Sequence, residues 1–137
     1  MRNENTNLNG TFKRGDVFLA NFPAIEGSSI QSGVRPIIIT SNEMALNYSP
    51  VIHGIPVTSK VNNKKEIPVH VKLTNNMFLR PSMALAEQEG LIDKTRLIKK
   101  IGTLSEEEMI NIDVAILMQR SMNKKYLYKI AKTLACA

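Results

Sequence analysis

Short apolar segments follow one another closely in the first 88 residues, and this spacing constrains the fold more than any other feature of the sequence. Alternating or β-branched patterns predict five strands. They cover residues 16–21, 36–40, 51–58, 67–73 and 83–88. The connections between them are too short for the crossover helix that a parallel pair of strands requires. The sequence therefore predicts an antiparallel barrel or sandwich rather than a parallel sheet.

The sequence changes character after residue 92, where we expect helices. Asp93 can cap a short helix that runs to Lys100, with Gly102 just beyond its end. Ser105 and Glu108 fit a capping box, in which the serine hydroxyl accepts from the amide of the glutamate and the glutamate reaches back. A second helix is therefore expected to begin at residue 106.

The length of 137 residues suits a single domain. Residues 1–12 are mostly polar and Asn-rich with nothing to bury, so we expect a disordered lead-in there. No signal-like apolar stretch and no window of 18 apolar residues is present, which predicts a cytoplasmic protein with no membrane span. The single cysteine, Cys136, excludes an intrachain disulfide and a zinc cage of thiolates.

The net charge of +6 favours an anionic partner such as a nucleic acid, but the charge is unevenly placed. Residues 119–137 carry five cationic side chains and no acidic one, which accounts for nearly all of the excess. The preceding part of the chain is close to neutral. Any binding of a nucleic acid by that part would therefore depend on a few well-placed groups.

Metal and cofactor chemistry find little support in the sequence. His53 and His70 are the only histidines, and neither has a carboxylate or a second histidine three or four positions on, so no metal site is expected. The glycines form no phosphate-binding loop, and no cofactor is expected. Acid–base cleavage of RNA by the two histidines is conceivable, although a histidine in a β-branched strand is more often a packed residue.

Two residues at strand ends are candidates for phosphate binding. Arg35 directly precedes Pro36 and the apolar run that follows it, where a Gly- and Ser-rich loop meets a rigid strand. A guanidinium held in this way can present a planar fork to a phosphate. Thr58 ends a later strand, where its hydroxyl can donate to a phosphate oxygen. The simpler interpretation is that Arg35 is a surface arginine and that Thr58 is an ordinary threonine at the end of a strand.

Taken in order, the segments of residues 13–120 resemble the MazF/PemK family of type II toxin–antitoxin ribonucleases. The most specific piece is GVRPIII at residues 33–39, followed at family spacing by EQ at residues 87–88 and DKTRL at residues 93–97. Shorter matches are KRGDV at residues 13–17 and the segments 27–28, 41–42, 47–50, 55–58 and 67–71.

The resemblance implies an α+β, mainly β fold: an SH3-like small antiparallel barrel of the CcdB/MazF type with appended C-terminal helices. It implies a domain at residues 13–122, usually a homodimer, followed by a basic extension at residues 123–137. It also implies metal-independent, sequence-specific cleavage of single-stranded RNA, with attack by the 2′-hydroxyl leaving 2′,3′-cyclic phosphate and 5′-hydroxyl ends. Arg35 would balance charge on the phosphorane, and Thr58 would hold a non-bridging oxygen.

Further residues match positions at which the family contacts RNA. These are Gln88, the neighbouring Glu87, and a loop serine that corresponds to Ser28 or Ser29, because the loop is one residue longer here. Residues 89–90, Glu-Gly, replace an apolar–Arg pair that is frequent in the family. This exchange removes a cation and adds an anion, which points to an altered recognition sequence.

The resemblance also implies a cognate antitoxin, whose acidic C-terminal segment lies in the RNA groove of the toxin. The alternatives are a gyrase poison of the CcdB kind, whose C-terminus contains a tryptophan that this chain lacks, and a catalytically inactive RNA-binding relative. In the extension, Tyr126, Ile130 and Leu134 are spaced for an amphipathic helix. That helix would contact RNA phosphates, touch the antitoxin or simply be solvated.

Overall fold

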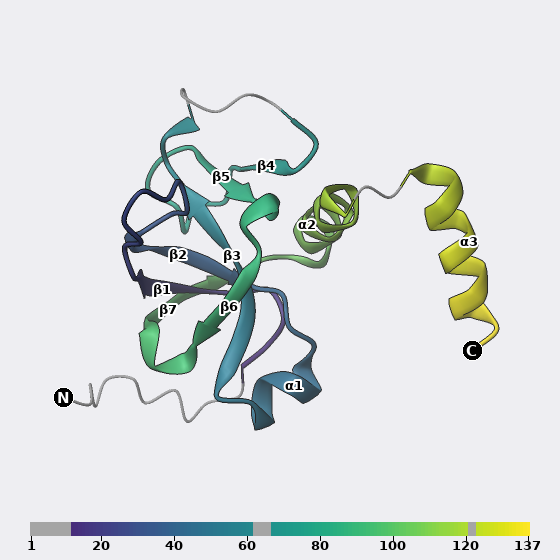
Figure 1. Ribbon diagram of the computed structural model, residues 1–137, viewed down its shortest axis with the longest axis horizontal. Coiled ribbons are helices and arrows are strands. Elements are labelled where there is room, and N and C mark those ends of the chain that lie inside the picture. Colours follow the sequence, from purple (N-terminus) through teal and green to yellow (C-terminus); the bar gives the residue numbers. More distant parts are fainter. Residues whose placement is uncertain (1–11, 62–66, 121–122) are drawn as a thin grey trace.

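The computed structural model describes residues 12–61, 67–120 and 123–137, and a single antiparallel sheet organises it (Figure 1). Its strands are β1 Asp16–Phe22, β2 Gly33–Ile39, β3 Val51–Thr58, β4 His70–Leu73, β5 Ser82–Leu85, β6 Gly90–Asp93 and β7 Leu97–Thr103. The helices are α1 Glu43–Tyr48, α2 Glu106–Gln119 and α3 Lys124–Ala135, with short 3₁₀ turns η2 Ala86–Gln88 and η3 Lys94–Arg96.

The strands are hydrogen-bonded in the order β4-β5-β3-β2-β1-β7, and β6 also pairs with β3. Every described pair is antiparallel, which confirms the expected mainly β architecture. In the part of the chain that the structure describes, β4 and β7 end the sheet without pairing with each other. The sheet is thus open rather than a fully closed barrel.

The apolar run in β2 lies at the centre of the sheet and is buried on both faces, as predicted. Ile38 belongs to one buried cluster with Val17, and α2 covers this cluster. Ile37 and Ile39 belong to a second cluster on the opposite face, closed in part by Leu46 of α1. Alternation along one strand therefore supplies two cores, which is why the run is continuously apolar.

Gly54 of β3 permits this close packing. A Cβ atom at this position would lie 2.5 Å from Cδ1 of Ile37, a fully buried neighbour on the adjacent strand. Only glycine fits there without a shift of the core.

The helix predicted from Asp93 to Lys100 is wrong. This segment forms the end of β6, the short turn η3 and the first half of β7. Strand β7 pairs along β1 with two register shifts, and Leu97 is buried in the second cluster. Sheet pairing and burial outweigh a weak helical pattern, and the side chain of Asp93 makes no cap.

Three other segments also differ from the expected secondary structure. The polar stretch at residues 41–50 contains α1, capped by Asn42, whose side chain accepts from Ala45 N at 2.8 Å. The strand expected at residues 67–73 begins only at His70, and the one expected at residues 83–88 ends at Leu85, where η2 begins. Most of the charged turn expected at residues 61–66 lies outside the described residues.

The chain already packs at Phe12, although the first twelve residues were expected to bury nothing. Phe12 is buried in the second cluster, with its ring 5.5 Å from that of Phe18 and the Lys94 ammonium 4.7 Å above it. The rest of the expected lead-in, residues 1–11, lies outside the described residues.

The two C-terminal helices differ in how they relate to the sheet. The capping box that begins α2 is confirmed: Ser105 Oγ accepts from Glu108 N at 3.1 Å, and a carboxylate oxygen of Glu108 accepts from Ser105 N at 2.9 Å. Helix α2 packs on the sheet through Met109, Ile112 and Ala115, whereas α3 stands apart from it (Figure 1). Within the described residues, no helix has the length and apolar character to cross a membrane.

Candidate active site and RNA-contact surface

Arg35 and Thr58, chosen from the sequence as a pair, line the same cleft. Arg35 lies on β2 opposite Ala20 of β1, and Thr58 ends β3 opposite Met83 of β5. The cleft has a volume of about 580 Å³. Its described lining contains four cations and no carboxylate: Arg35, Lys60, Arg80 and Lys99. We call it the basic cleft.

The guanidinium of Arg35 is held at its base by the loop that precedes β2. Its Nε donates to the Ser32 carbonyl at 2.9 Å, and its Nη1 donates to the side-chain oxygen of Gln31. Partial burial lowers the pKa of Arg35 from its ordinary value, but a guanidinium stays protonated at neutral pH. Three of its five N–H donors lie outside these two bonds, so it is positioned and still able to bind an anion.

Thr58 is buried at the end of its strand, and its hydroxyl is oriented by the chain that follows. Thr58 Oγ1 accepts from the backbone N–H of Lys60 at 3.2 Å. Because the oxygen acts as the acceptor in this bond, the hydroxyl proton can be donated to a ligand in the cleft.

Sequence reasoning missed three cations of the basic cleft, since they come from segments far apart in the chain. Only the sheet register brings Lys99 close: Leu19 of β1 pairs with Lys99 on one side and with Pro36 on the other. Lys60 follows the end of β3, and Arg80 precedes β5. No local pattern marks any of these three residues, and only knowledge of the strand order could have found them.

A second cleft of about 400 Å³ has its own set of lining residues, and we call it the apolar cleft. Ile25, Ile30, Ile37 and Leu91 contribute to its apolar walls. The polar groups at this cleft are Gln31, Glu87, Gln88 and Glu89. The described lining includes no lysine or arginine. It therefore suits an uncharged, flat group better than a phosphate.

Gln31, which the sequence analysis did not single out, connects the two clefts. Its backbone N–H donates to the side-chain oxygen of Gln88 at 2.9 Å, while its side chain accepts from Arg35. A residue of the apolar cleft is thus linked through a single loop residue to the arginine of the basic cleft. Loops of this composition carry no sequence pattern that predicts such a bond.

The remaining predicted contact residues fall into two groups. Glu87 lines the apolar cleft and lies 2.7 Å from His70 Nε2. Ser28 and Ser29 are exposed in the loop before β2, where Ser28 Oγ accepts from Ile30 N at 3.1 Å. Within the described residues, neither serine lines the basic or the apolar cleft.

The two histidines lie outside the linings of both clefts. This placement of His53 and His70 disfavours a paired-histidine mechanism. Among the residues that the structure describes, no three His, Cys, Asp or Glu side chains form a candidate metal cluster.

The structure explains the acidic residue of the unusual Glu89-Gly90 pair. One carboxylate oxygen of Glu89 accepts from Thr40 Oγ1 at 2.7 Å, and the other lies 3.6 Å from the Arg120 guanidinium. Glu89 thus ties the end of β2 to the end of α2. Its charge is countered within the chain, and Gly90 leaves the apolar cleft without the side chain of a cation.

Comparisons with known proteins agree with this architecture. The family of PemK-like, MazF-like toxins of type II toxin–antitoxin systems matches residues 13–119. The endoribonuclease MazF of Staphylococcus epidermidis is 37% identical over 113 residues, which cover 81% of this chain and 92% of that protein.

Solved structures show the same fold at lower identity. MazF from Deinococcus radiodurans superposes with a TM-score of 0.69 at 18% identity, covering 82% of this chain and 99% of that one. A mycobacterial endoribonuclease in complex with its cognate antitoxin gives a TM-score of 0.64 at 18% identity, covering 81% of this chain and 96% of that one. The helix α3 follows the segment that the family matches.

Proposed function

This chain belongs to the PemK-like, MazF-like toxins of type II toxin–antitoxin systems and is a toxin endoribonuclease, and we propose that it cleaves single-stranded RNA in the basic cleft with Arg35 and Thr58 as its catalytic residues. The observation that carries this proposal is the meeting of these two side chains in a cleft with four cations and no carboxylate in its described lining. Such a cleft attracts and holds a phosphodiester.

The reaction that fits these groups uses the nucleophile that RNA itself provides. The 2′-oxygen bonds to the adjacent phosphorus while the bond from phosphorus to the 5′-oxygen breaks. The 2′-hydroxyl loses its proton and the 5′-oxygen gains one, which leaves 2′,3′-cyclic phosphate and 5′-hydroxyl ends. Positioning and charge stabilisation are the main demands of such a step, and neither requires a metal ion.

Arg35 and Thr58 would share the charge that develops on the phosphorane. The N–H groups of Arg35 outside its two loop bonds would donate to a non-bridging oxygen or to the departing 5′-oxygen. The hydroxyl proton of Thr58 would go to the other non-bridging oxygen. Arg35 acts as a donor rather than as a base because a guanidinium does not lose its proton at neutral pH.

The flanking parts of the RNA would occupy the rest of the surface. Lys60, Arg80 and Lys99 would neutralise neighbouring phosphates, so we expect binding to weaken as salt rises. A base of the RNA would enter the apolar cleft, where Gln88 and Glu87 offer hydrogen bonds. The loop serines Ser28 and Ser29 would contact a neighbouring part of the RNA strand. The missing cation at Gly90 would alter which base is preferred.

Two protein partners complete the proposal. MazF structures of related toxins include complexes with their antitoxins, and an acidic antitoxin segment would fit the basic cleft in place of RNA. We also propose a homodimer, because the outer face of α2 exposes Ile110, Val114 and Met118. Exposed apolar side chains grouped on one helix face are typical of a protein–protein contact.

The test is RNA cleavage in the presence of EDTA. A long single-stranded RNA maps the cut sites, and a short oligonucleotide carrying a mapped site then gives rates. We expect cyclic-phosphate and 5′-hydroxyl ends, no cleavage of the oligonucleotide with 2′-deoxyribose at the cut site, and a loss of about 10²-fold or more with Arg35→Ala. Arg96→Ala, a matched arginine removal outside both clefts, should keep the wild-type rate. Cleavage of the 2′-deoxy substrate, or full activity of Arg35→Ala, would refute the mechanism.

A further inference from the structure

Helix α2 is apolar on the face that it turns away from the sheet as well as on the face that it buries. Ile110, Val114 and Met118 recur at every fourth position of this outer face, with exposures of 54%, 50% and 38%. Leu117, half-buried, lies beside this row by helical geometry. We call the three exposed residues the α2 stripe.

Helix α3 has one apolar and one cationic half. At 100° per residue, Tyr126, Leu127, Ile130 and Leu134 fall within one half of the helix, and Lys125, Lys129 and Lys132 fall on the other. No residue of α3 is buried, and none belongs to either apolar cluster of the sheet. Its apolar half is therefore only partly covered, since Leu127 and Ile130 are half-buried while Tyr126 and Leu134 are exposed.

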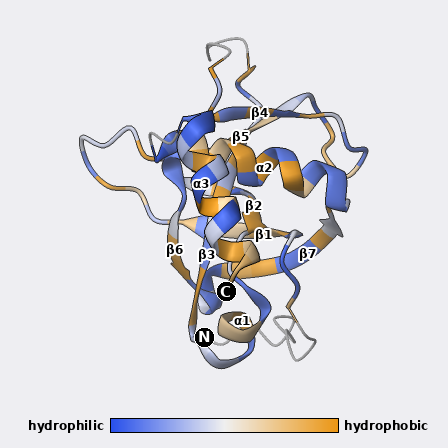
Figure 2. Ribbon diagram, turned by 90° about the vertical axis from the view of Figure 1, so that its right-hand side faces the viewer, coloured by the Kyte–Doolittle hydropathy of each residue, from blue (hydrophilic) through white to orange (hydrophobic). Residues whose placement is uncertain are grey.

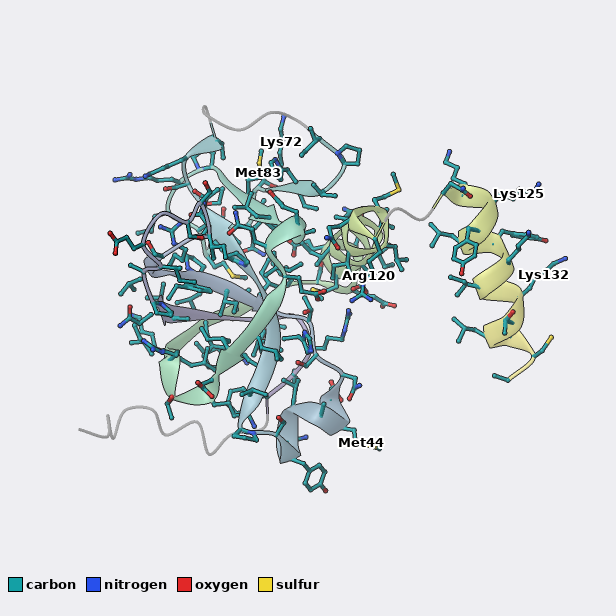
Figure 3. The ribbon with its side chains drawn as sticks, in the orientation of Figure 1. Met44, Lys72, Met83, Arg120, Lys125 and Lys132 are labelled. Carbon is teal, nitrogen blue, oxygen red and sulfur yellow. The ribbon has the colours of Figure 1, made fainter. Side chains whose placement is uncertain are left out.

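The orientation of α3 indicates what covers it. Lys125 and Lys132 project from the side of α3 that faces away from α2 (Figure 3). The opposite side, which carries Ile130 and Leu134, must therefore face toward the α2 side of the molecule. The view turned by 90° shows α3 in front of the sheet, with hydrophilic and hydrophobic segments alternating along it, and α2 running off to its side (Figure 2). A flat lipid surface could not reach an apolar face that is turned inward, whereas a protein helix could.

We propose that α3 is an exchanged arm, whose apolar half packs against the α2 stripe of a second copy of this chain. This inference rests on the proposed homodimer and adds to it a contact from a helix beyond the family match, which ends at residue 119. In a two-fold dimer the same contact forms twice, so that both α2 stripes and both α3 arms are covered.

The two surfaces match in spacing and in charge. The α2 stripe and the row Tyr126, Ile130 and Leu134 both repeat every four residues, which allows the ridges of one helix to fill the grooves of the other. The first turn of α2 also exposes Glu106 and Glu107 beside its stripe. Lys124 and Lys129 flank the apolar half of α3 and offer these carboxylates a partner.

The first test is the dimer dissociation constant of the full chain, measured by sedimentation velocity. Ile130→Lys places a charge in the proposed contact and retains a good helix former. We expect it to raise the dissociation constant about tenfold or more. Tyr128→Lys adds the same charge to the cationic half and is expected to have little effect. Circular dichroism of both variants checks that the helix persists.

Cross-linking identifies which α2 each arm contacts. One copy carries Val114→Cys and a second copy, with a tag of different mass, carries Ile130→Cys, both with Cys136→Ser. A short bis-maleimide should join the two tagged copies into a mixed dimer. The absence of this product, or a dissociation constant unchanged by Ile130→Lys in a dimeric wild type, would overturn the exchanged arm.

Other outcomes separate this inference from the proposals on which it rests. A wild type that remains monomeric would refute the homodimer and the arm together. Binding of the wild type to vesicles of phosphatidylcholine and phosphatidylglycerol, lost in Ile130→Lys while the dimer persists, would overturn the arm in favour of a lipid surface. RNA cleavage by the Arg35→Ala variant tests the catalytic proposal independently of both.

Discussion

Replacing Gln31 with alanine is expected to slow RNA cleavage about tenfold while leaving RNA affinity and thermal stability nearly unchanged. The side chain of Gln31 is one of two acceptors that hold the Arg35 guanidinium, and the other is the Ser32 carbonyl. A hydrogen bond to a charged donor contributes about 1.5–3 kcal/mol. Gln31 is half-buried, so the lower end of this range applies, and a barrier higher by about 1.4 kcal/mol lowers a rate about tenfold.

The substitution isolates this one contact because the other bond of Gln31 is made by its backbone. The backbone N–H of Gln31 donates to Gln88 Oε1 at 2.9 Å, and this hydrogen bond is kept in Gln31→Ala. The matched control is Ser32→Ala, which keeps the carbonyl that accepts from Arg35 Nε and loses only its hydroxyl, so the cleavage rate should not change.

The assay is the single-turnover cleavage rate at saturating RNA, together with the dissociation constant of an oligonucleotide with 2′-deoxyribose at the cut site. A positioning role lowers the rate and leaves the dissociation constant in place. An unchanged rate would refute the reasoning, as would a dissociation constant that rises in proportion to the loss of rate, because the contact would then serve RNA binding rather than the orientation of Arg35.

Three substitutions test the packing that supports the site, each measured by thermal unfolding. Gly54→Ala should destabilise the protein by about 1–3 kcal/mol, because its Cβ would lie 2.5 Å from a side-chain carbon of buried Ile37. Ser105→Ala should cost about 1 kcal/mol through loss of the α2 capping box, whereas an unchanged midpoint would show that the cap contributes nothing. Arg14→Ala breaks the paired hydrogen bonds to Asp113 that tie the start of β1 to α2. With these side chains 33% and 39% exposed, the loss should be about 1 kcal/mol, and it should be smaller when Asp113 is already alanine, because only the bond from Arg14 Nε to the Thr40 carbonyl is then lost.

Parts of the fold could be predicted from sequence because burial leaves a local pattern. The run in β2 is apolar at every position since its alternate residues enter two different clusters. The capping box of α2 is equally local, because its donor and acceptor atoms lie three residues apart. The helix expected at residues 93–100 failed for the opposite reason: β7 exists because β1, about eighty residues earlier, offers it a hydrogen-bonding edge.

The residues of the candidate site also fall into two groups: those that a local sequence motif marks and those that only the fold brings to the site. Arg35, Thr58 and Gln88 carry family motifs and were named from the sequence, and the structure brings the first two into one cleft. Their catalytic roles stay predictions. Gln31 and Lys99 were not named, because one depends on how a loop folds over β2 and the other on the register of β7 against β1. A sequence pattern shows which residues face a core, but it does not show which distant side chains a sheet places side by side.

Net charge and local charge point to RNA for different reasons in this protein. Most of the excess of +6 belongs to the C-terminal segment, whose lysines Lys125 and Lys132 lie on the side of α3 away from α2 (Figure 3). The basic cleft collects its four cations from segments that are balanced by acids elsewhere in the sequence. The cleft is positively charged because its described lining holds four cations and no carboxylate, not because the domain is basic. Removing the charge of α3 would therefore bring the whole chain close to neutral and still leave the four cations of the basic cleft in place.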